Sequence, residues 1–180
     1  MPLTQGQFCP EIQVHDIENQ PLSLQLMRGT PVLLSFLREV NCGFCNRRIR
    51  ELKEGADALR EQGLQVIAII AGSEETVREY AEREQLRFRI IADPGGSLHQ
   101  RFGLRRSTSG VFRAMTRVRT VAELAAQGEL GMSTVLGEPL LPGDFVLHND
   151  GTIARAHYGA DLGDHLPLSK VSEWLTHFAC

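Results

Sequence analysis

The sequence predicts an α/β protein with a central mixed β-sheet and helices on both faces of the sheet. Two short apolar runs, residues 31–37 and 64–71, are rich in strand formers and bounded by Gly or Pro, as strands buried on both faces should be. Between them, residues 44–62 repeat apolar side chains at helical spacing and end before Gly63. A strand, a helix and a strand in this order form a right-handed βαβ unit with parallel strands.

The remaining elements extend this unit on both sides. We expect helices over residues 74–84, within 105–128 and over 168–178, a strand over 88–91, a helical turn before Phe102, a loop over 128–142 and an N-terminal hairpin within 8–26. The tripeptide Asn149-Asp150-Gly151, placed between two apolar stretches, predicts a β-hairpin. No repeat or low-complexity stretch interrupts the chain, so we expect residues 1–180 to form one domain.

Composition is that of an ordinary globular protein and argues against several functional classes. Of the 180 residues, 42% are hydrophobic and 23% are charged, and the net charge of −3 gives no support to nucleic-acid binding. No apolar run approaches the ~20 residues that a membrane-spanning helix needs. The opening residues carry neither a basic stretch nor an apolar core, so we expect no signal peptide and a cytoplasmic location.

The group that carries chemistry is the pair Cys42 and Cys45, which directly follows a predicted buried strand and opens a helix. A close cysteine pair in a chain with four cysteines indicates redox or metal chemistry. The thiolate is the reactive form of cysteine, and a helix N-terminus favours an anion. Arg47, Arg48 and Arg50 add positive charge to the first turns, so we expect them to stabilise a thiolate further.

Helical spacing distinguishes the two sulfurs. Cys45 is in phase with the apolar positions of the helix, so we expect it on the inward face. Cys42 precedes the first full turn and is expected to be the more exposed of the two. Cys42 is therefore the expected attacking cysteine, and Cys45 the partner that closes an internal disulfide.

Two other interpretations of the pair remain open at this point. One is an inert, packed pair, which the expected exposure of Cys42 argues against. The other is half of a zinc site, which needs two further ligands. The chain has neither a second Cys-x-x-Cys nor a His pair at i, i+4, and His157 and His165 are eight residues apart. We therefore expect neither a metal nor a cofactor.

Residues 34–50, which hold the Cys-x-x-Cys group, resemble the active-site strand and helix of peroxiredoxin-like proteins. These proteins form the alkyl hydroperoxide reductase and thiol-specific antioxidant (AhpC/TSA) group of the thioredoxin superfamily. Further segments agree in their order along the chain, namely residues 6–10, 92–98, 102–104, 142–147, 150–151 and 163–165. The resemblance implies a thioredoxin-like, peroxiredoxin-like fold and a thiol-based oxidoreductase that is reset by an external reductant of the thioredoxin or glutathione type.

The sequence departs from the usual peroxiredoxin pattern at the site itself. In the family's Pro-x-x-x-Thr-x-x-Cys register, Arg38 takes the proline position, Cys42 the threonine position and Cys45 the cysteine position. The arginine that the family places before the late strand has no match. Pro142 instead resembles the proline, usually cis, that faces the Cys-x-x-Cys of thioredoxins. A backbone group beside such a proline could pair with a disulfide-bearing chain by strand addition.

Three functions follow from these residues. The first is a dithiol–disulfide oxidoreductase that reduces disulfides or oxidised sulfur through Cys42 and Cys45. The second is a thiol-dependent peroxidase that reduces hydrogen peroxide or organic hydroperoxides through a sulfenic acid. The third is a redox-responsive binding module whose disulfide alters a partner surface near residues 105–119.

Several neighbouring side chains have two interpretations each. Arg38 and Glu39 either tune the thiolate or pair with each other in solvent. Phe44 either shapes the approach to the sulfurs or packs beside the active-site loop. The Arg-rich segment 105–119 either docks an acidic partner or a membrane surface, or is helical with its Arg face in water.

The remaining cysteines and three histidines complete the set of candidates. We expect Cys9 to be a small packed residue and Cys180 to be an exposed terminal thiol, and each is also a candidate resolving cysteine. His148, His157 and His165 are expected to be hydrogen-bonded sheet or loop residues rather than bases.

Overall fold

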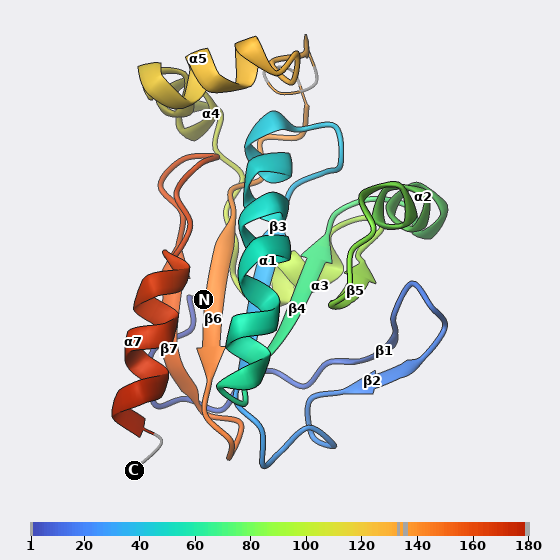
Figure 1. The fold of residues 1–180 in the computed structure, drawn as a ribbon, viewed down its shortest axis with the longest axis vertical. Helices are drawn as coiled ribbons and strands as arrows, with labels where there is room; N and C mark the ends of the chain where they lie inside the picture. The colour runs from blue at the N-terminus through green and yellow to red at the C-terminus, as the bar shows by residue number, and fades with distance from the viewer. Residues whose placement is uncertain (1, 133, 135–136, 179–180) are drawn as a thin grey trace.

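A five-stranded mixed sheet lies at the centre of the computed structural model, which describes residues 2–132, 134 and 137–178 (Figure 1). The strands, in spatial order, are β5 (Arg89–Ala92), β4 (Gln65–Ile70), β3 (Val32–Leu37), β6 (Gly143–Leu147) and β7 (Ile153–Tyr158). Strands β3, β4 and β5 run parallel, whereas β6 is antiparallel to both β3 and β7. The predicted mixed sheet, the parallel strand–helix–strand unit and the late hairpin are confirmed.

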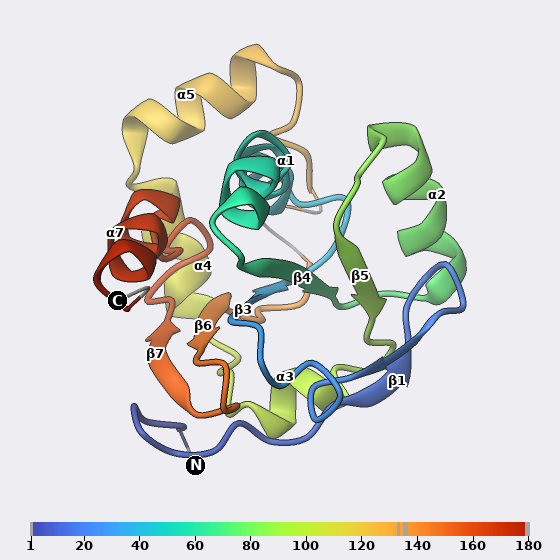
Figure 2. The ribbon, with the colours of Figure 1, turned by 60° about the horizontal axis from the view of Figure 1, so that its bottom comes forward.

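Different elements cover the two faces of the sheet (Figure 2). On one face lie α1 (Gly43–Glu61), α2 (Glu74–Glu84) and α7 (Leu168–Phe178), and on the other lie α3 (Ser97–Arg101) and the hairpin of β1 (Gln13–His15) and β2 (Pro21–Ser23). Helices α4 (Thr108–Met115) and α5 (Val118–Ala126) lie beyond the end of the sheet, next to the beginning of α1. Helices therefore cover both faces, as predicted, although the second face is covered mainly by the hairpin and one short helix.

Strand β3 is buried along its whole length because it has a neighbouring strand on each side and a cover on each face. Its side chains alternate between two apolar clusters, as the period of two in a strand requires. Phe36 packs against Phe102 and Phe145 on the α3 face, with ring centroids 4.7 and 5.7 Å apart. On the opposite face, Leu33 and Leu37 belong to the cluster that includes α1. This double cover explains the continuous apolar run.

The segment 128–142 differs from its prediction as a plain loop. Met132 and Thr134 are helical within it, and Leu140 and Leu141 are buried. Leu141 donates its backbone N–H to the carbonyl of Arg105, 2.9 Å away. The three glycines and two prolines of this stretch indicated a loop, but the two buried leucines between its prolines pack against the segment that includes Arg106 and Gly110.

The chain after β7 turns so tightly that it requires glycine at position 159. The Gly159 N–H donates to the carbonyl of Pro142 at 2.9 Å. A Cβ at position 159 would lie 2.7 Å from the carbonyl oxygen of Asp164 and 3.0 Å from that of Pro142. We predict that Gly159→Ala lowers the free energy of unfolding by about 1–3 kcal/mol, because two backbone segments must separate.

Urea unfolding of the variant measures this loss. Gly72→Ala is the matched control, since the atom nearest to its added Cβ is a Val77 methyl at 3.3 Å rather than backbone. Equal stability of the two variants would show that the Gly159 turn is not tightly packed.

Candidate active site

The Cys-x-x-Cys group joins the end of β3 to the beginning of α1. Cys42 has an extended backbone conformation immediately before the helix, and its carbonyl accepts the N–H of Asn46 at 2.9 Å. Cys45 lies in the first helical turn. Both cysteines are thiols in this structure. The parallel part of the sheet therefore places the pair beyond the carboxyl end of its central strand, next to helical N–H groups that have no partner within the helix.

The pKa values of the two thiols shift in opposite directions because one thiol donates a hydrogen bond to the other. The Cys45 thiol donates to the Cys42 sulfur and, together with the charge of Arg38 and the N–H groups of Cys45 and Phe44, lowers the pKa of Cys42 to about 7 against the effect of burial. The same hydrogen bond, with burial and the negative charge of Cys42, raises the pKa of Cys45 well above its ordinary value. Near neutral pH, Cys42 is thus the cysteine that more readily forms a thiolate.

The expectation that Cys42 is the more exposed sulfur is wrong. Cys42 is 0% exposed and Cys45 is 5% exposed. The periodicity of α1 describes only the inward face of that helix, whereas segments much later in the chain cover Gly43, the residue after Cys42. Both cysteines belong to the apolar cluster that also contains Leu124 of α5.

The later segments lie directly on the turn between the two cysteines. The Gly43 N–H donates to the Thr134 hydroxyl at 3.2 Å, and that hydroxyl donates to the carbonyl of Glu129. A Cβ at Gly43 would lie 2.6 Å from the Glu129 oxygen and 3.3 Å from the Cδ1 atom of Leu124. Glycine at this position therefore permits the close approach of the covering backbone.

Arg38 is buried, and its side chain contacts both a later segment of the chain and the adjacent residue. Its guanidinium donates to the Thr134 carbonyl at 3.2 Å and pairs with Glu39 at 3.0 Å. The side chain of Arg38 is 1% exposed and that of Glu39 is 30% exposed. Both interpretations of this pair thus hold in part: the two residues form an ion pair, but the arginine end is out of solvent and lowers the pKa of Cys42. The Glu39 N–H hydrogen-bonds to Cys45 and favours its thiolate.

The three arginines in the first turns of α1 pair with acidic and polar groups of other segments. Arg47 donates to the Thr120 hydroxyl at 2.7 Å, and Arg50 pairs with Glu129 at 2.5 Å. Arg48 is directed into the protein interior. The arginine whose charge lowers the pKa of Cys42 is Arg38, at the end of β3. We expected this charge to come from the arginines in the first turns of α1. Proximity in the sequence misled that expectation, because it does not reveal which carboxylates neutralise a side chain.

The positions of Phe44 and Pro142 do not match the functions that the sequence suggested for them. Phe44 is 1% exposed and packs against Gly163, so its ring is part of the core beside the active-site turn. The described residues contain no cis peptide bond, so the bond before Pro142 is trans. The Pro142 carbonyl already accepts from Gly159, and the Leu141 N–H is bonded to Arg105. The backbone beside Pro142 is therefore occupied, contrary to the expected strand addition.

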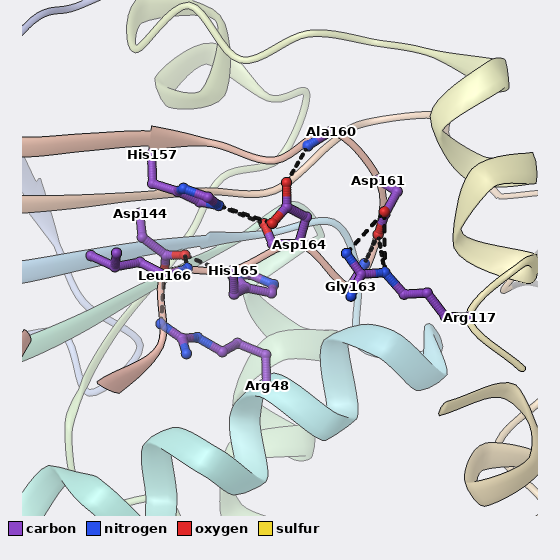
Figure 3. A network of polar contacts seen from close by, with 10 residues as sticks. All are labelled: Arg48, Arg117, Asp144, His157, Ala160, Asp161, Gly163, Asp164, His165 and Leu166. Atoms are coloured by element: carbon purple, nitrogen blue, oxygen red, sulfur yellow. Dashed lines mark hydrogen bonds and ion pairs between the residues drawn. The ribbon is translucent and has the colours of Figure 1, made fainter. Parts of the chain in front are cut away.

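A buried polar network links α1 to the sheet, and the sequence analysis did not identify it (Figure 3). Asp144 of β6 is fully buried and accepts from Ser35 at 2.6 Å, from Arg48 at 3.0 Å and from His165 at 3.0 Å. It also accepts the N–H of Leu166. Burial opposes ionisation, but the charges of Arg48 and His165 overcome it and hold the pKa of Asp144 well below its usual range. A serine and an aspartate inside two apolar strands were the signal in the sequence.

A second buried pair anchors the end of β3. The His99 ring contacts Asp93 through Nδ1 at 2.7 Å and the Leu37 carbonyl through Nε2 at 3.0 Å. Asp93 is a residue of the Asp-Pro segment that carried part of the family resemblance. Burial raises the pKa of this carboxyl, but its bonds from the His99 side chain and from backbone N–H groups outweigh that effect and lower it overall. Leu37 directly precedes Arg38, so this pair holds the strand end from which the charge of Arg38 acts on Cys42.

The histidines and the Arg-rich segment have mainly structural contacts. His157 bonds to Asp164, and the His148 ring packs against Trp174. Within the segment 105–119, Arg117 forms a bidentate ion pair with Asp161 (Figure 3). Two further arginines there are paired, Arg106 with Glu138 and Arg119 with Glu123. Much of the positive charge expected to be available to a partner is thus neutralised within the chain.

Cys9 lies apart from this site, because it packs against the apolar cluster on the other face of the sheet. Burial and the nearby Glu11 raise the pKa of Cys9 to about 12, which makes this partly buried thiol a poor nucleophile at neutral pH. Cys180 lies outside the described residues. Within the part of the chain that the structure describes, no three His, Cys, Asp or Glu side chains converge as metal ligands, and no helix has the length and apolarity to cross a membrane.

The hydrogen bond between the two thiols leads to a testable prediction. In a chain whose Cys9 and Cys180 are replaced by Ser, the alkylation rate of Cys42 by iodoacetamide should rise with pH with a midpoint near 7. Cys45→Ala removes the hydrogen-bond donor, so the midpoint should move upward. The first unit of upward shift lowers the thiolate fraction at pH 7 roughly fivefold. An unchanged midpoint in Cys45→Ala would show that Cys45 does not stabilise the Cys42 thiolate.

The buried carboxylate leads to a second prediction. We expect Asp144→Asn to lower the free energy of unfolding at pH 7 by about 3–5 kcal/mol, because Arg48 would remain buried without its counter-charge. The folded-state pKa of Asp144 lies below the unfolded value of about 3.9. Its contribution is therefore complete above that pH and is lost as the pH falls through the folded-state pKa.

Urea unfolding between pH 7 and pH 2 tests this second prediction. The stability difference between wild type and Asp144→Asn should shrink on acidification. The surface variant Asp57→Asn, whose partner is the exposed Arg60, serves as the control and should differ little from wild type at any pH. A pH-independent difference would contradict the assignment of an ionised Asp144.

Comparison with known proteins places this site in a family. Residues 5–156 match the AhpC/TSA family. Among curated relatives, "Peroxiredoxin Q, chloroplastic" of Sedum lineare is 24% identical over 102 residues, which cover 57% of this chain and 55% of that protein. "Peroxiredoxin Bcp" of Escherichia coli is 25% identical over 103 residues, covering 57% and 66%. "Thiol-disulfide oxidoreductase ResA" of Halalkalibacterium halodurans is 28% identical over 101 residues, covering 56% and 57%. Each match spans less than two thirds of the relative's length.

Solved structures agree on the fold. The peroxidoxin BcpB of Mycobacterium tuberculosis has a TM-score of 0.70 at 15% identity, with 97% of each chain covered. A thiol peroxidase of Chromobacterium violaceum has a TM-score of 0.71 at 14% identity, with 100% of this chain and 90% of that chain covered. These likenesses confirm the predicted thioredoxin-like fold. The family match over most of the chain also confirms the resemblance seen at the Cys-x-x-Cys helix: the protein belongs to the AhpC/TSA family.

Proposed function

We propose that this protein is a dithiol–disulfide oxidoreductase that reduces disulfides or oxidised sulfur with Cys42 and Cys45. The observation that carries the proposal is the opposite shift of the two thiol pKa values, which provides one thiolate and one protonated partner side by side. The names of the curated relatives, peroxiredoxins and a thiol–disulfide oxidoreductase, support the same chemical class.

The proposed reaction has two steps. The Cys42 thiolate attacks one sulfur of the substrate disulfide, whose S–S bond breaks and releases a substrate thiolate that takes up a proton. Cys45 then loses its proton and attacks the Cys42 sulfur of the mixed disulfide, which releases the second substrate thiol. The substrate gains two electrons and the protein is left with a Cys42–Cys45 disulfide. An external thiol reductant of the thioredoxin or glutathione type restores the dithiol, so we also propose a reducing compartment such as the cytoplasm.

A thiol peroxidase is the second candidate, favoured by the AhpC/TSA match and the peroxiredoxin names of several relatives. The thiolate would attack the O–O bond of a hydroperoxide, which gives a cysteine sulfenic acid and releases the alcohol, or water from hydrogen peroxide. The neighbouring thiol would then condense with the sulfenic acid and release water. The family register assigns the attack to Cys45, but its raised pKa favours Cys42 in this chain. Arg38, at the position of the family's proline, supplies the nearby positive charge.

A redox-responsive binding module is the third candidate. Its disulfide would alter a surface near residues 105–119, where Arg105 and Arg113 are exposed. Turnover separates this candidate from the two enzymes. An enzyme consumes many equivalents of oxidant in the presence of a thiol reductant, whereas a sensor changes state once and alters its affinity for a partner.

Stopped-flow oxidation of the reduced protein tests the proposal. Hydrogen peroxide and a small disulfide are compared as oxidants for wild type, Cys42→Ser and Cys45→Ser. We expect fast disulfide exchange in wild type that Cys42→Ser abolishes, together with a slow reaction with peroxide. In Cys45→Ser, the first attack should persist and the mixed disulfide should accumulate.

The other outcomes identify the alternatives. A fast peroxide reaction that survives Cys42→Ser and disappears in Cys45→Ser would establish a peroxidase in the peroxiredoxin register and refute our assignment of the attacking cysteine. Reaction with neither oxidant would refute both enzymatic candidates.

A further inference from the structure

The Cys-x-x-Cys turn is covered by a segment whose contribution to the apolar cluster is Leu124 together with the partly buried Val121 and Leu130. We define the cover segment as residues 118–131, which comprise α5 and the turn after it. Its backbone at Glu129 and the side chain of Leu124 lie against Gly43, between the two cysteines. Leu124 is the one residue of α5 that is fully buried. Cys42 is completely buried and directly precedes Gly43, so movement of this segment away from Gly43 would uncover the turn that holds the Cys42 sulfur.

Polar contacts at the surface attach the cover segment to α1. Arg50 bonds to Glu129 at 2.5 Å and to the Gln127 side chain at 2.9 Å. Arg47, one turn earlier, contacts Thr120 and Glu123. The side chains of Arg50 and Glu129 are 38% and 23% exposed. Ion pairs of this exposure contribute little to stability individually, so the attachment is weak compared with a packed core.

We propose that the cover segment is a gate over Cys42 and that the Arg50–Glu129 pair is its latch. The proposal rests on the proposed function, because it concerns access to the same thiolate. In the closed state the sulfur is shielded; when the latch opens, the cover segment moves away from Gly43 and the thiolate meets its oxidant. Arg50 and Glu129 then determine how readily oxidants reach Cys42, without taking part in the reaction.

The latch and a purely electrostatic function of Arg50 predict effects of opposite sign. If the Arg50 charge stabilised the thiolate, Arg50→Gln would raise the midpoint of the pH–rate curve and slow alkylation at pH 7. If Arg50 is the latch, the same variant opens the gate more often. Alkylation then becomes faster, and the midpoint stays where it is in wild type.

The experiment measures the rate at which Cys42 reacts with iodoacetamide and with 4,4′-dithiodipyridine, both uncharged, across pH 6–9. The protein is the full chain with Cys9 and Cys180 replaced by Ser. We expect Arg50→Gln to accelerate both reactions roughly two- to fivefold, the range that corresponds to the loss of one exposed ion pair. Glu129→Gln breaks the latch from its other side and should accelerate them equally.

Two controls make the result specific to the latch. Arg60→Gln removes another exposed, ion-paired arginine of α1, at the opposite end of the helix, and should leave the rates unchanged. The exchange Arg50→Glu with Glu129→Arg rebuilds the pair with reversed charges and should restore the wild-type rate. Circular dichroism verifies that each variant is folded. If Arg50→Gln does not fold, the rates of Glu129→Gln alone test the latch.

Rates in Arg50→Gln and Glu129→Gln that equal those of Arg60→Gln would overturn the gate, as would opposite effects of the two variants. In either case the reaction of Cys42 in wild type persists and the proposed function stands. A wild-type Cys42 that reacts with neither reagent at any pH would instead refute the proposed function.

Discussion

One buried carboxylate connects the elements that position the cysteine pair. Asp144 accepts from Arg48 of α1, Ser35 of β3 and His165 of the loop before α7. Removing such charges from water costs several kcal/mol per ion unless they remain paired. A rotation or shift of α1 against the sheet would therefore leave Arg48 or Asp144 buried without a partner. Since Arg48 follows Cys45 by three residues, the same constraint sets where the first turn of α1, with its sulfurs, can lie.

Four arginines close to the cysteines have different functions because their neighbours differ. Arg38 is buried at the end of β3 and lowers the pKa of Cys42. Arg48 completes the buried network, whereas Arg47 and Arg50 hold the cover segment at the protein surface. A charge out of solvent acts strongly on a nearby thiol, but a solvated and paired charge acts weakly. Burial and pairing, more than distance along the chain, thus decide which arginine influences the reaction.

The secondary structure followed closely from local patterns. The apolar runs became β3 and β4, the Asn149-Asp150-Gly151 turn joined β6 to β7, and α1 began one residue from its predicted start. These predictions succeed because strand and helix periods and turn residues act over a few positions. The segment 128–142 was less predictable, since its glycines and prolines indicate a loop while Leu140 and Leu141 are buried and contact residues 105–110.

By itself, the sequence determined the α/β fold and the position of a Cys-x-x-Cys group where a buried strand meets a helix. It also indicated redox chemistry, because a thiolate is favoured at such a helix start. Only the tertiary structure decided that both sulfurs are buried, that Arg38 is the arginine that acts on Cys42, and that Asp144 is ionised in the interior. The physical reason is the separation along the chain of the residues that interact. Periodicity shows only which side of a helix or strand faces the core, whereas burial and charge pairing depend on residues such as Glu129 and Asp144, some 80 to 100 positions further along the chain.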